Sequence, residues 1–480
     1  MRIRSLNSKC LSTLKLGADN NFILGRHDRR QMPVGQGGFH IGGLTSGEIS
    51  QIRTHNNKGI ARFKESDLIY VYDCGSVPKE SVMREISSLL RQIGRRKLDL
   101  LFLSHFDCDH MCGIPHLLSK KNGLQVDTII LPYIDDAERV MAFARAVSAN
   151  DDGVGTISRF FEQMVIDPIR SLGLLGARQI IQIISGDGDI RIGEETTNPP
   201  SHDDPDTRVV WEIDGEKVDG DEPDFRKLTY VLKRRGSKDK KEIQVFFAKK
   251  LDLIASGKSS DFKWLLKPWV RPADPHVLQR FYEEAEKELG WPAGTFTTKM
   301  RNINCRRYVV TEGRAKVARA YLAAFSTQRG IPKHEAKNGT SMSLYSGPLA
   351  STNLDAISLY PFQAEHCLTK VGWMGTGDML LKNEKDIGEF KNSYKHELEY
   401  ITNFMLPHHG SINNSDPEHL ISDAEYWTVS ADPPKRWMHP HPDVQRAALK
   451  KGDFCHVRAS DWSAFDESIL FFFIKNIYFS

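Results

Sequence analysis

The stretch that decides the fold reads His105-Phe106-Asp107-Cys108-Asp109-His110, directly after an apolar run at 98–104 that is typical of a buried strand. Two histidines and two aspartates within six residues supply ligand-type side chains at close spacing. Loops at strand ends are where rigid scaffolds carry their chemistry. Imidazole and carboxylate groups together suit zinc, manganese or iron, so we predict a metal site rather than a polar loop whose charges are only solvated.

Composition places the chain among ordinary globular proteins. Its 480 residues, of which 40% are hydrophobic and 26% charged, can bury a large core. The net charge of +3 is too small to argue by itself for a nucleic-acid partner. No apolar run approaches the ~20 residues of a membrane helix, and no apolar signal core follows the N-terminus. We therefore expect a cytoplasmic protein with no membrane role, whose seven scattered cysteines are free thiols.

Apolar runs and helical spacing predict the elements around this stretch. Strands are predicted at 68–72, 98–104, 127–133, 341–345, 370–374, 400–406, 425–430 and 469–474. Helices are predicted at 81–91, 277–289 and 315–325, with two more helices within 139–172. Strands at both ends of the chain with helices between them fit a layered α/β sandwich.

The middle of the chain differs in composition. We predict that residues 196–335 form an insertion between the halves 1–195 and 336–480 of the catalytic fold. Residues 203–224 are strongly acidic with little apolar periodicity, which is typical of a solvated loop or linker. A protein partner could bind through this insertion.

A basic segment at 226–258 follows the acidic one. Its Lys233, Arg234 and Arg235 are candidate substrate-binding residues, because lysine and arginine supply the salt-dependent part of phosphate binding. The alternative is a solvated face that the preceding acidic run compensates. The sequence leaves both interpretations open.

The His-x-Asp-x-Asp-His stretch resembles the metallo-β-lactamase superfamily, whose hallmark is His-x-His-x-Asp-His after a strand. Asp107 stands where the hallmark has its second histidine, in a form similar to the hydrolase domain of bacterial competence DNA-uptake proteins. Segments 375–378 (Gly-Thr-Gly-Asp) and 407–411 (Pro-His-His-Gly-Ser) are similar to later motifs of the superfamily, in the same order. The resemblance implies a four-layer αββα sandwich with an inserted region.

The resemblance also implies two divalent metal ions, zinc or manganese. The implied ligands are His105, Asp107, Asp109, His110, Asp378 and His408. The side chains implied to orient them are Asp73, His409 and Ser411. Which histidine of the adjacent pair binds metal is left open, with His408 favoured, and a plain turn aspartate is the alternative for Asp73. The third-motif histidine of the superfamily has no clear match, which shifts the site toward oxygen ligands and favours manganese over zinc.

Three residues are implied to act in catalysis. Asp378 would bridge the ions and orient a hydroxide formed between them, and Asp109 would hold its proton. His439 belongs to a His-Pro-His-Pro element that resembles one in the competence branch, and it would serve the leaving group. His441 of the same element would contact the substrate. A rigid exposed loop is the alternative for both histidines.

The expected function is metal-dependent hydrolysis of a phosphodiester bond in DNA, RNA or a nucleotide. One alternative is hydrolysis of another ester, a thioester or a lactam on the same fold. A channel with basic walls would favour the first and a compact apolar pocket the second. A third interpretation is a non-catalytic or partner-activated component of a defence-type complex, against which the intact order of the ligands argues.

Overall fold

The structure is a computed structural model. It describes residues 23–47, 63, 66–77, 79–93, 97–119, 121–150, 157–185, 209–214, 225–233, 240–257, 263–325, 339–349, 354–360, 370–432, 438–460 and 463–473. Among these residues, no helix is both long and apolar enough to cross a lipid bilayer.

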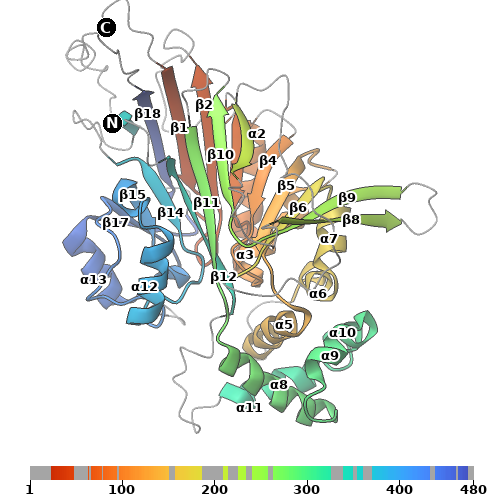
Figure 1. The fold of residues 1–480 in the computed structure, drawn as a ribbon. Helices are drawn as coiled ribbons and strands as arrows, with labels where there is room; N and C mark the ends of the chain where they lie inside the picture. Colours follow the sequence, from red (N-terminus) through yellow and green to blue (C-terminus); the bar gives the residue numbers. More distant parts are fainter. Residues whose placement is uncertain are drawn as a thin grey trace, which may run out of the picture.

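Two β-sheets lie face to face (Figure 1). Within the described residues, the ten strands of one sheet follow the spatial order β13 (Leu354–Tyr360), β18 (Phe465–Phe473), β1 (Ile23–Gln31), β2 (His40–Gly47), β3 (Leu68–Tyr72), β4 (Lys97–Phe102), β5 (Gln125–Pro132), β6 (Gln179–Ile183), β9 (Lys240–Ala248) and β8 (Phe225–Lys233). The eight described strands of the other sheet follow the order β17 (Asp453–Val457), β16 (Tyr426–Ser430), β15 (Ile401–Met405), β14 (Gly372–Gly375), β12 (Ser341–Pro348), β11 (Lys263–Arg271), β10 (Asp252–Gly257) and β7 (Val209–Asp214).

Helices cover the outer faces of both sheets. On the side of the ten-stranded sheet the described helices are α2 (Lys79–Ile93), α3 (Cys108–Met111), α4 (Ile114–Leu117), α5 (Asp136–Asn150), α6 (Arg159–Ile166) and α7 (Pro168–Leu174). Four further described helices join the same core at one end of the sandwich: α8 (Pro275–Leu289), α9 (Phe296–Met300), α10 (Ile303–Val310) and α11 (Arg314–Phe325). On the side of the eight-stranded sheet they are α12 (Glu384–Ser393) and α13 (Pro442–Lys451).

Three apolar cores hold these layers together. The core between the sheets includes the buried rings of Tyr72, Trp264 and Trp373. A second core joins the ten-stranded sheet to its helices, and a third joins the eight-stranded sheet to α12 and α13. Burying each large apolar side chain stabilises the fold by about 1.5–3 kcal/mol. The layer order helix, sheet, sheet, helix confirms the predicted α/β sandwich of the metallo-β-lactamase type.

A run of parallel strands in each sheet positions the site. β3, β4, β5 and β6 run parallel in one sheet, and β14, β15 and β16 run parallel in the other. The first four are buried along nearly their whole length, as expected for interior parallel strands, which read as continuous apolar runs. The loops that follow parallel neighbours leave the sheet at the same edge.

The structure adds detail where the sequence was ambiguous. Three helices, α5 to α7, stand where two were predicted within 139–172. The extra boundary falls at Asp167, whose side chain accepts a hydrogen bond from the Arg170 amide, with Pro168 at the first helical position. Proline is favoured there because the N–H at the first helical position has no acceptor within the helix, so its absence costs nothing, and because the fixed φ of proline suits the first turn.

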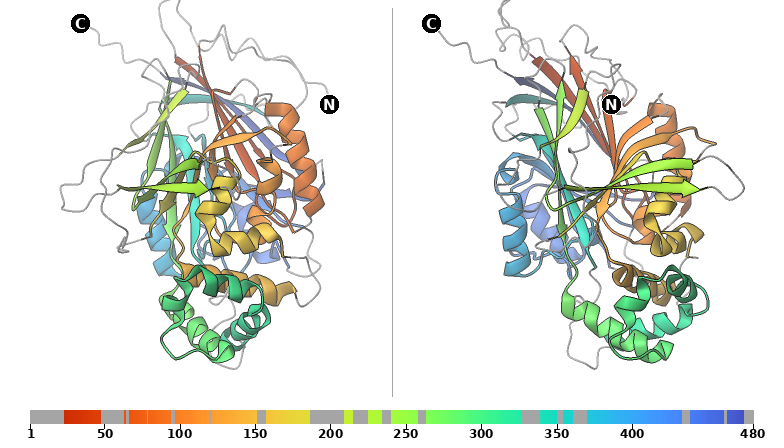
Figure 2. Two further views of the ribbon diagram at one scale, coloured as in Figure 1. Left: turned by 90° about the vertical axis from the view of Figure 1, so that its right-hand side faces the viewer. Right: turned by 45° about the vertical axis from the view of Figure 1, so that its right-hand side comes forward.

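Residues 196–335 contribute to both sheets and to a separate group of helices. β9 pairs in parallel with β6, and β11 pairs antiparallel with β12. The loop predicted at 203–224 was wrong for β7, which pairs with β10. Its Val209, Trp211 and Ile213 recur at every second position, and β-branched and aromatic residues at this spacing suit a strand. Helices α8 to α11 gather at one end of the sandwich beside α5 (Figure 2). The division at 195 and 335 stays a prediction.

Candidate metal centre

The predicted ligands come from loops that follow strands of both sheets. His105 to His110 follow β4, and Asp73 follows β3, its parallel neighbour. From the other sheet, Asp378 follows β14 and the pair His408-His409 follows β15 within the short helix η5 (His408–Gly410). The structure brings these loops together at the seam between the sheets.

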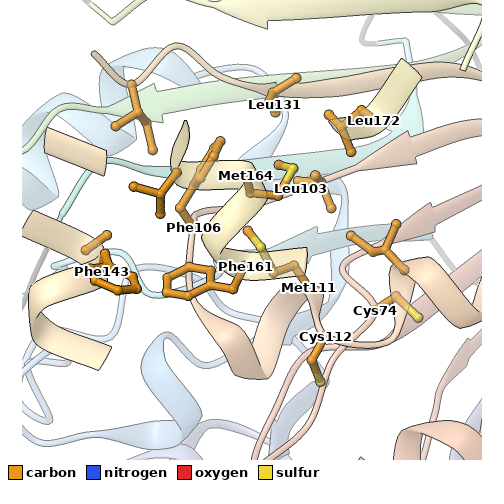
Figure 3. Close-up of a cluster of buried hydrophobic side chains, with 14 of the residues drawn as sticks. Cys74, Leu103, Phe106, Met111, Cys112, Leu131, Phe143, Phe161, Met164 and Leu172 are labelled. Carbon is orange, nitrogen blue, oxygen red and sulfur yellow. The ribbon is translucent and has the colours of Figure 1, made fainter. Parts of the chain in front are cut away.

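Apolar side chains anchor the loop that carries most of the ligands. Phe106 and Met111 are 2% and 0% exposed and belong to the core beneath the loop. Figure 3 shows them with Phe161 and Met164 of α6 and Phe143 of α5. The Cys74 amide also donates to the His110 carbonyl oxygen (2.8 Å). The polar side chains of the loop therefore stand on a packed base.

Asp73 fixes the ring of His110. Its Oδ1 accepts from the Ser104 amide (2.7 Å), and its Oδ2 accepts from Ser104 Oγ (2.6 Å) and His110 Nδ1 (2.8 Å). Because the carboxylate only accepts here, the proton lies on Nδ1, which leaves the lone pair of Nε2 for other contacts. Asp73 has a φ of 59°, a strained conformation that is common at functional sites.

Asp378 faces three histidines. Its Oδ2 lies 3.4 Å from His105 Nε2 and 3.5 Å from His408 Nδ1, and its Oδ1 lies 3.4 Å from His110 Nε2. All three of these nitrogens and Oδ1 are buried without a hydrogen-bond partner. Buried polar atoms of this kind are costly unless something satisfies them, and their lone pairs are what a divalent metal needs.

His409 presents a second lone pair to a carboxylate. Its Nδ1 donates to the Ser430 carbonyl oxygen (2.8 Å), so in the neutral ring the lone pair of Nε2 faces Asp109 Oδ2 at 3.2 Å. A cation between two such acceptors removes their repulsion. Donor atoms of Asp109, His110 and His409 lie within 4.8 Å of one another, as do those of His105, His110 and Asp378. The residues present therefore fit a metal site.

The charges at the site favour a cation. Burial and His110 lower the pKa of His105, but Asp378 and Asp107 outweigh them and raise it to about 9. Burial likewise lowers the pKa of His110, while Asp73, Asp109 and Asp378 hold it well above its usual range. Burial raises the pKa of Asp378, yet the histidines His408, His105 and His110 hold it well below. The carboxylates thus stay ionised and draw positive charge to the site. In the metal-free chain that charge is a proton on the histidine ring, and a bound ion would replace it on the Nε2 lone pair.

Asp107 has an unpredicted partner, Arg145 of α5. The guanidinium Nη2 of Arg145 donates to Asp107 Oδ1, while Asp107 Oδ2 lies 3.5 Å from His105 Nε2. Both side chains are about four-fifths buried. The helical pattern around Arg145 predicts an amphipathic helix and carries no signal of this contact.

The glycine-rich segment at 34–39 packs against the site. A Cβ at Gly38 would lie 2.7 Å from His110 Nδ1 and 2.9 Å from Asp73 Oδ2, so only glycine fits without movement. In the same segment, Gln36 Nε2 donates to His439 Nδ1 (3.3 Å). The missing side chain lets the backbone approach the ligands, and Gln36 is a site residue that the sequence did not reveal.

The structure places the remaining predicted residues as follows. The His439 ring lies 5.4 Å from the His408 ring and 6.1 Å from the His409 ring, measured between centroids. His441 caps α13, where its Nδ1 accepts from the Asp443 amide (3.2 Å). Ser411 is buried, and its Oγ accepts from the Asn413 amide (3.2 Å).

The side chains of the predicted phosphate-binding residues lie outside the described part of the structure. Lys233 ends β8, whose side chains lie outside the described part of the structure. Arg234 and Arg235 lie outside the described residues altogether. Their contact with a substrate stays a prediction.

Comparison with known proteins finds a local similarity to ribonuclease Z. The chain is 30% identical over 91 residues to Ribonuclease Z of Listeria welshimeri and of Listeria monocytogenes, which is 19% of this chain and 28% of those proteins. It is 30% identical over 80 residues to Ribonuclease Z of Lactobacillus delbrueckii subsp. bulgaricus, 17% of this chain and 24% of that protein. No protein-family model matches the sequence. The similarity supports the metallo-β-lactamase superfamily, and the resemblance to competence proteins stays a prediction.

Proposed function

We propose that the chain is a metal-dependent hydrolase that cleaves phosphodiester bonds in nucleic acid, with RNA as the first substrate to test. The carrying observation is that His110 and His409 are each held, by Asp73 and by the Ser430 carbonyl, with a lone pair aimed at a carboxylate oxygen. The local similarity to ribonuclease Z supports the substrate class.

Two ligand groups follow from the donor atoms. The first position takes Asp109, His110 and His409, and the second takes His105 and Asp378, with His110 within reach of both. Asp107 lies beside His105 and His408 lies beside Asp378, so both can complete the second position. Asp378 lies between them, because one oxygen faces His110 and the other faces His105. Zinc suits the histidines and manganese suits the carboxylates. Bound divalent ions would supply Lewis acidity toward the phosphoryl oxygens and activate water.

The side chains of the chain itself orient the reaction. Asp73 and Ser430 hold the histidine rings, so that ligand geometry does not have to reorganise during turnover. Asp109 is ionised and stands beside His409, where it can hold the proton of the attacking water. His439, which Gln36 holds beside His408, would give a proton to the leaving oxygen.

Free cysteines close to the site support a location inside the cell. Cys74 and Cys112 are buried free thiols near the metal-carrying loop, as in proteins kept reduced. We propose that the protein acts in the cytoplasm. A protein partner bound through residues 196–335 remains part of this proposal.

The test is cleavage by the purified chain of bis-p-nitrophenyl phosphate, single-stranded RNA, single-stranded DNA and double-stranded DNA. Each reaction would contain Mn²⁺, Zn²⁺ or a chelator. We expect metal-dependent cleavage that Asp109→Asn and His409→Ala each lower by at least about a hundredfold. His419→Ala is the matched control, since it removes an exposed histidine that pairs with Asp416 away from the site.

Absence of cleavage of all four substrates by a protein shown to carry metal would overturn the nuclease proposal. Cleavage of a carboxylic ester, thioester or lactam under the same conditions would then identify the alternative activity.

A further inference from the structure

The contact between Arg145 and Asp107 makes the two ligand groups electrically unequal. Arg145 occupies one oxygen of a carboxylate whose other oxygen lies 3.5 Å from His105 Nε2. Within the described part of the chain, the ion pairs of Asp109 and Asp378 are with histidines. Among the described residues, the ligand that pairs directly with a permanent cation is therefore Asp107, which belongs to the second position.

Arg145 is held firmly in this place. α5 packs against α11 on one side, and its Phe143 belongs to the core shown in Figure 3. With the Arg145 side chain 19% exposed and that of Asp107 20% exposed, water and salt screen this charge only weakly. Guanidinium does not lose its proton in proteins, so the charge is present at every working pH.

The histidines add to the difference between the positions. In the first position, both rings are fixed through Nδ1, by Asp73 and by Ser430. In the second, Ser104 Oγ holds His105 through its Nδ1 (2.8 Å), but His408 Nδ1 faces Asp378 at 3.5 Å with no hydrogen bond of its own. Ligands that are already oriented bind metal more tightly.

We propose that Arg145 is a positioning residue that makes the second metal position weaker than the first. It takes Asp107 Oδ1, leaves only Oδ2 for an ion, and repels a dication that approaches that oxygen. We infer that this repulsion, in a site about four-fifths buried, outweighs the gain from orienting one carboxylate. The first position therefore fills at lower metal concentration, and the second fills only as the concentration rises.

This inference rests on the ligand groups of the proposed function, but its test reads metal binding rather than cleavage. Metal-free protein would be titrated with Mn²⁺ and separately with Zn²⁺ by calorimetry, with bound metal counted by mass spectrometry after dialysis. We expect two ions with affinities at least about tenfold apart in the natural sequence. Two ions of equal affinity would overturn the inference and leave the proposed function intact.

Variants of Arg145 give the second measurement. Arg145→Met removes the charge and keeps most of the volume, and we expect it to raise the weaker affinity at least about tenfold without changing the stronger one. Arg145→Lys keeps the charge and should behave like the natural sequence. A weaker affinity that is unchanged or lower in Arg145→Met would overturn the inference, because it would mean that Arg145 has no effect or only orients Asp107.

Arg314→Met is the matched control. Arg314 lies on α11, where its guanidinium stacks over the Phe143 ring and pairs with Glu162. The substitution therefore removes a nearby cation and leaves the contact between Arg145 and Asp107 in place. We expect both metal affinities to stay unchanged in this variant. Melting temperatures would establish that each variant is folded, and the titration of the natural sequence tests the inference even if Arg145→Met does not fold. If no metal binds to the natural sequence, the proposed function fails first.

Discussion

His409 and Asp109 face each other across the site at 3.2 Å, with His409 turned so that its Nδ1 donates to Ser430. His408, the adjacent residue, points to Asp378 instead. In the proposed assignment, the two neighbouring histidines therefore serve different ligand groups, which leads to the first prediction.

His409→Ala should weaken the tighter metal position, and His408→Ala should weaken only the looser one. We expect a loss of at least about tenfold in the affected affinity, because each variant removes a ligand or its closest neighbour. Calorimetric titration with Mn²⁺ checks this. Equal losses of both affinities in both variants would show that the rings are interchangeable.

Asp73→Asn should lower the affinity of the first position by about 10–100-fold. The asparagine amide has one acceptor oxygen and one NH2 donor, so it cannot accept from the Ser104 amide, Ser104 Oγ and His110 Nδ1 as the two carboxylate oxygens do, and the bond that fixes the His110 tautomer is weakened. Ser104→Ala keeps the carboxylate and should cost less than Asp73→Asn in the same titration. An Asp73→Asn variant with unchanged metal affinity would favour the alternative in which Asp73 only forms a turn.

Gly38→Ala should disturb the site, because its Cβ would lie 2.7 Å from His110 Nδ1. We expect the unfolding free energy to fall by about 1–3 kcal/mol and metal affinity to fall with it. Gly388→Ala is the control, since a Cβ there meets nothing within 4 Å inside α12. That variant should be neutral or more stable by up to about 1 kcal/mol. Urea unfolding of both variants measures the difference.

Glu138 should make the protein less stable as pH rises. Burial raises the pKa of Glu138 to about 7, against hydrogen bonds from Thr340 that lower it. Between about 4.5 and about 7, the folded chain holds a proton that the unfolded chain has released, so the unfolding free energy falls as pH rises through this window. The loss attributable to Glu138 is on the order of 3 kcal/mol.

Glu138→Gln provides the check on that pH dependence, because it keeps the acceptor for the Thr340 amide and removes the titrating group. Its urea midpoint should exceed that of the natural sequence at pH 8 and approach it at pH 5. Parallel pH curves for the two proteins would rule out the assignment to Glu138.

The strands beside the motifs could be predicted from sequence, because interior parallel strands read as continuous apolar runs. The partner of Asp107 could not, since the contact with Arg145 spans 38 residues and depends on how α5 packs. The direction of each histidine in the adjacent pair was also beyond prediction. His408 and His409 have φ values of 47° and 56°, which side-chain propensity does not foretell.

Because the site lies at the seam between the sheets, metal binding would connect the two halves of the chain. His110 and Asp109 belong to the chain's first half and Asp378 and His409 to its second, so a bound ion would be a cross-link that closes a loop of more than two hundred and fifty residues. Metal binding would then stabilise the association of the first and second halves of the fold. Two separately produced halves should therefore associate more tightly when metal is added than when they are mixed without it.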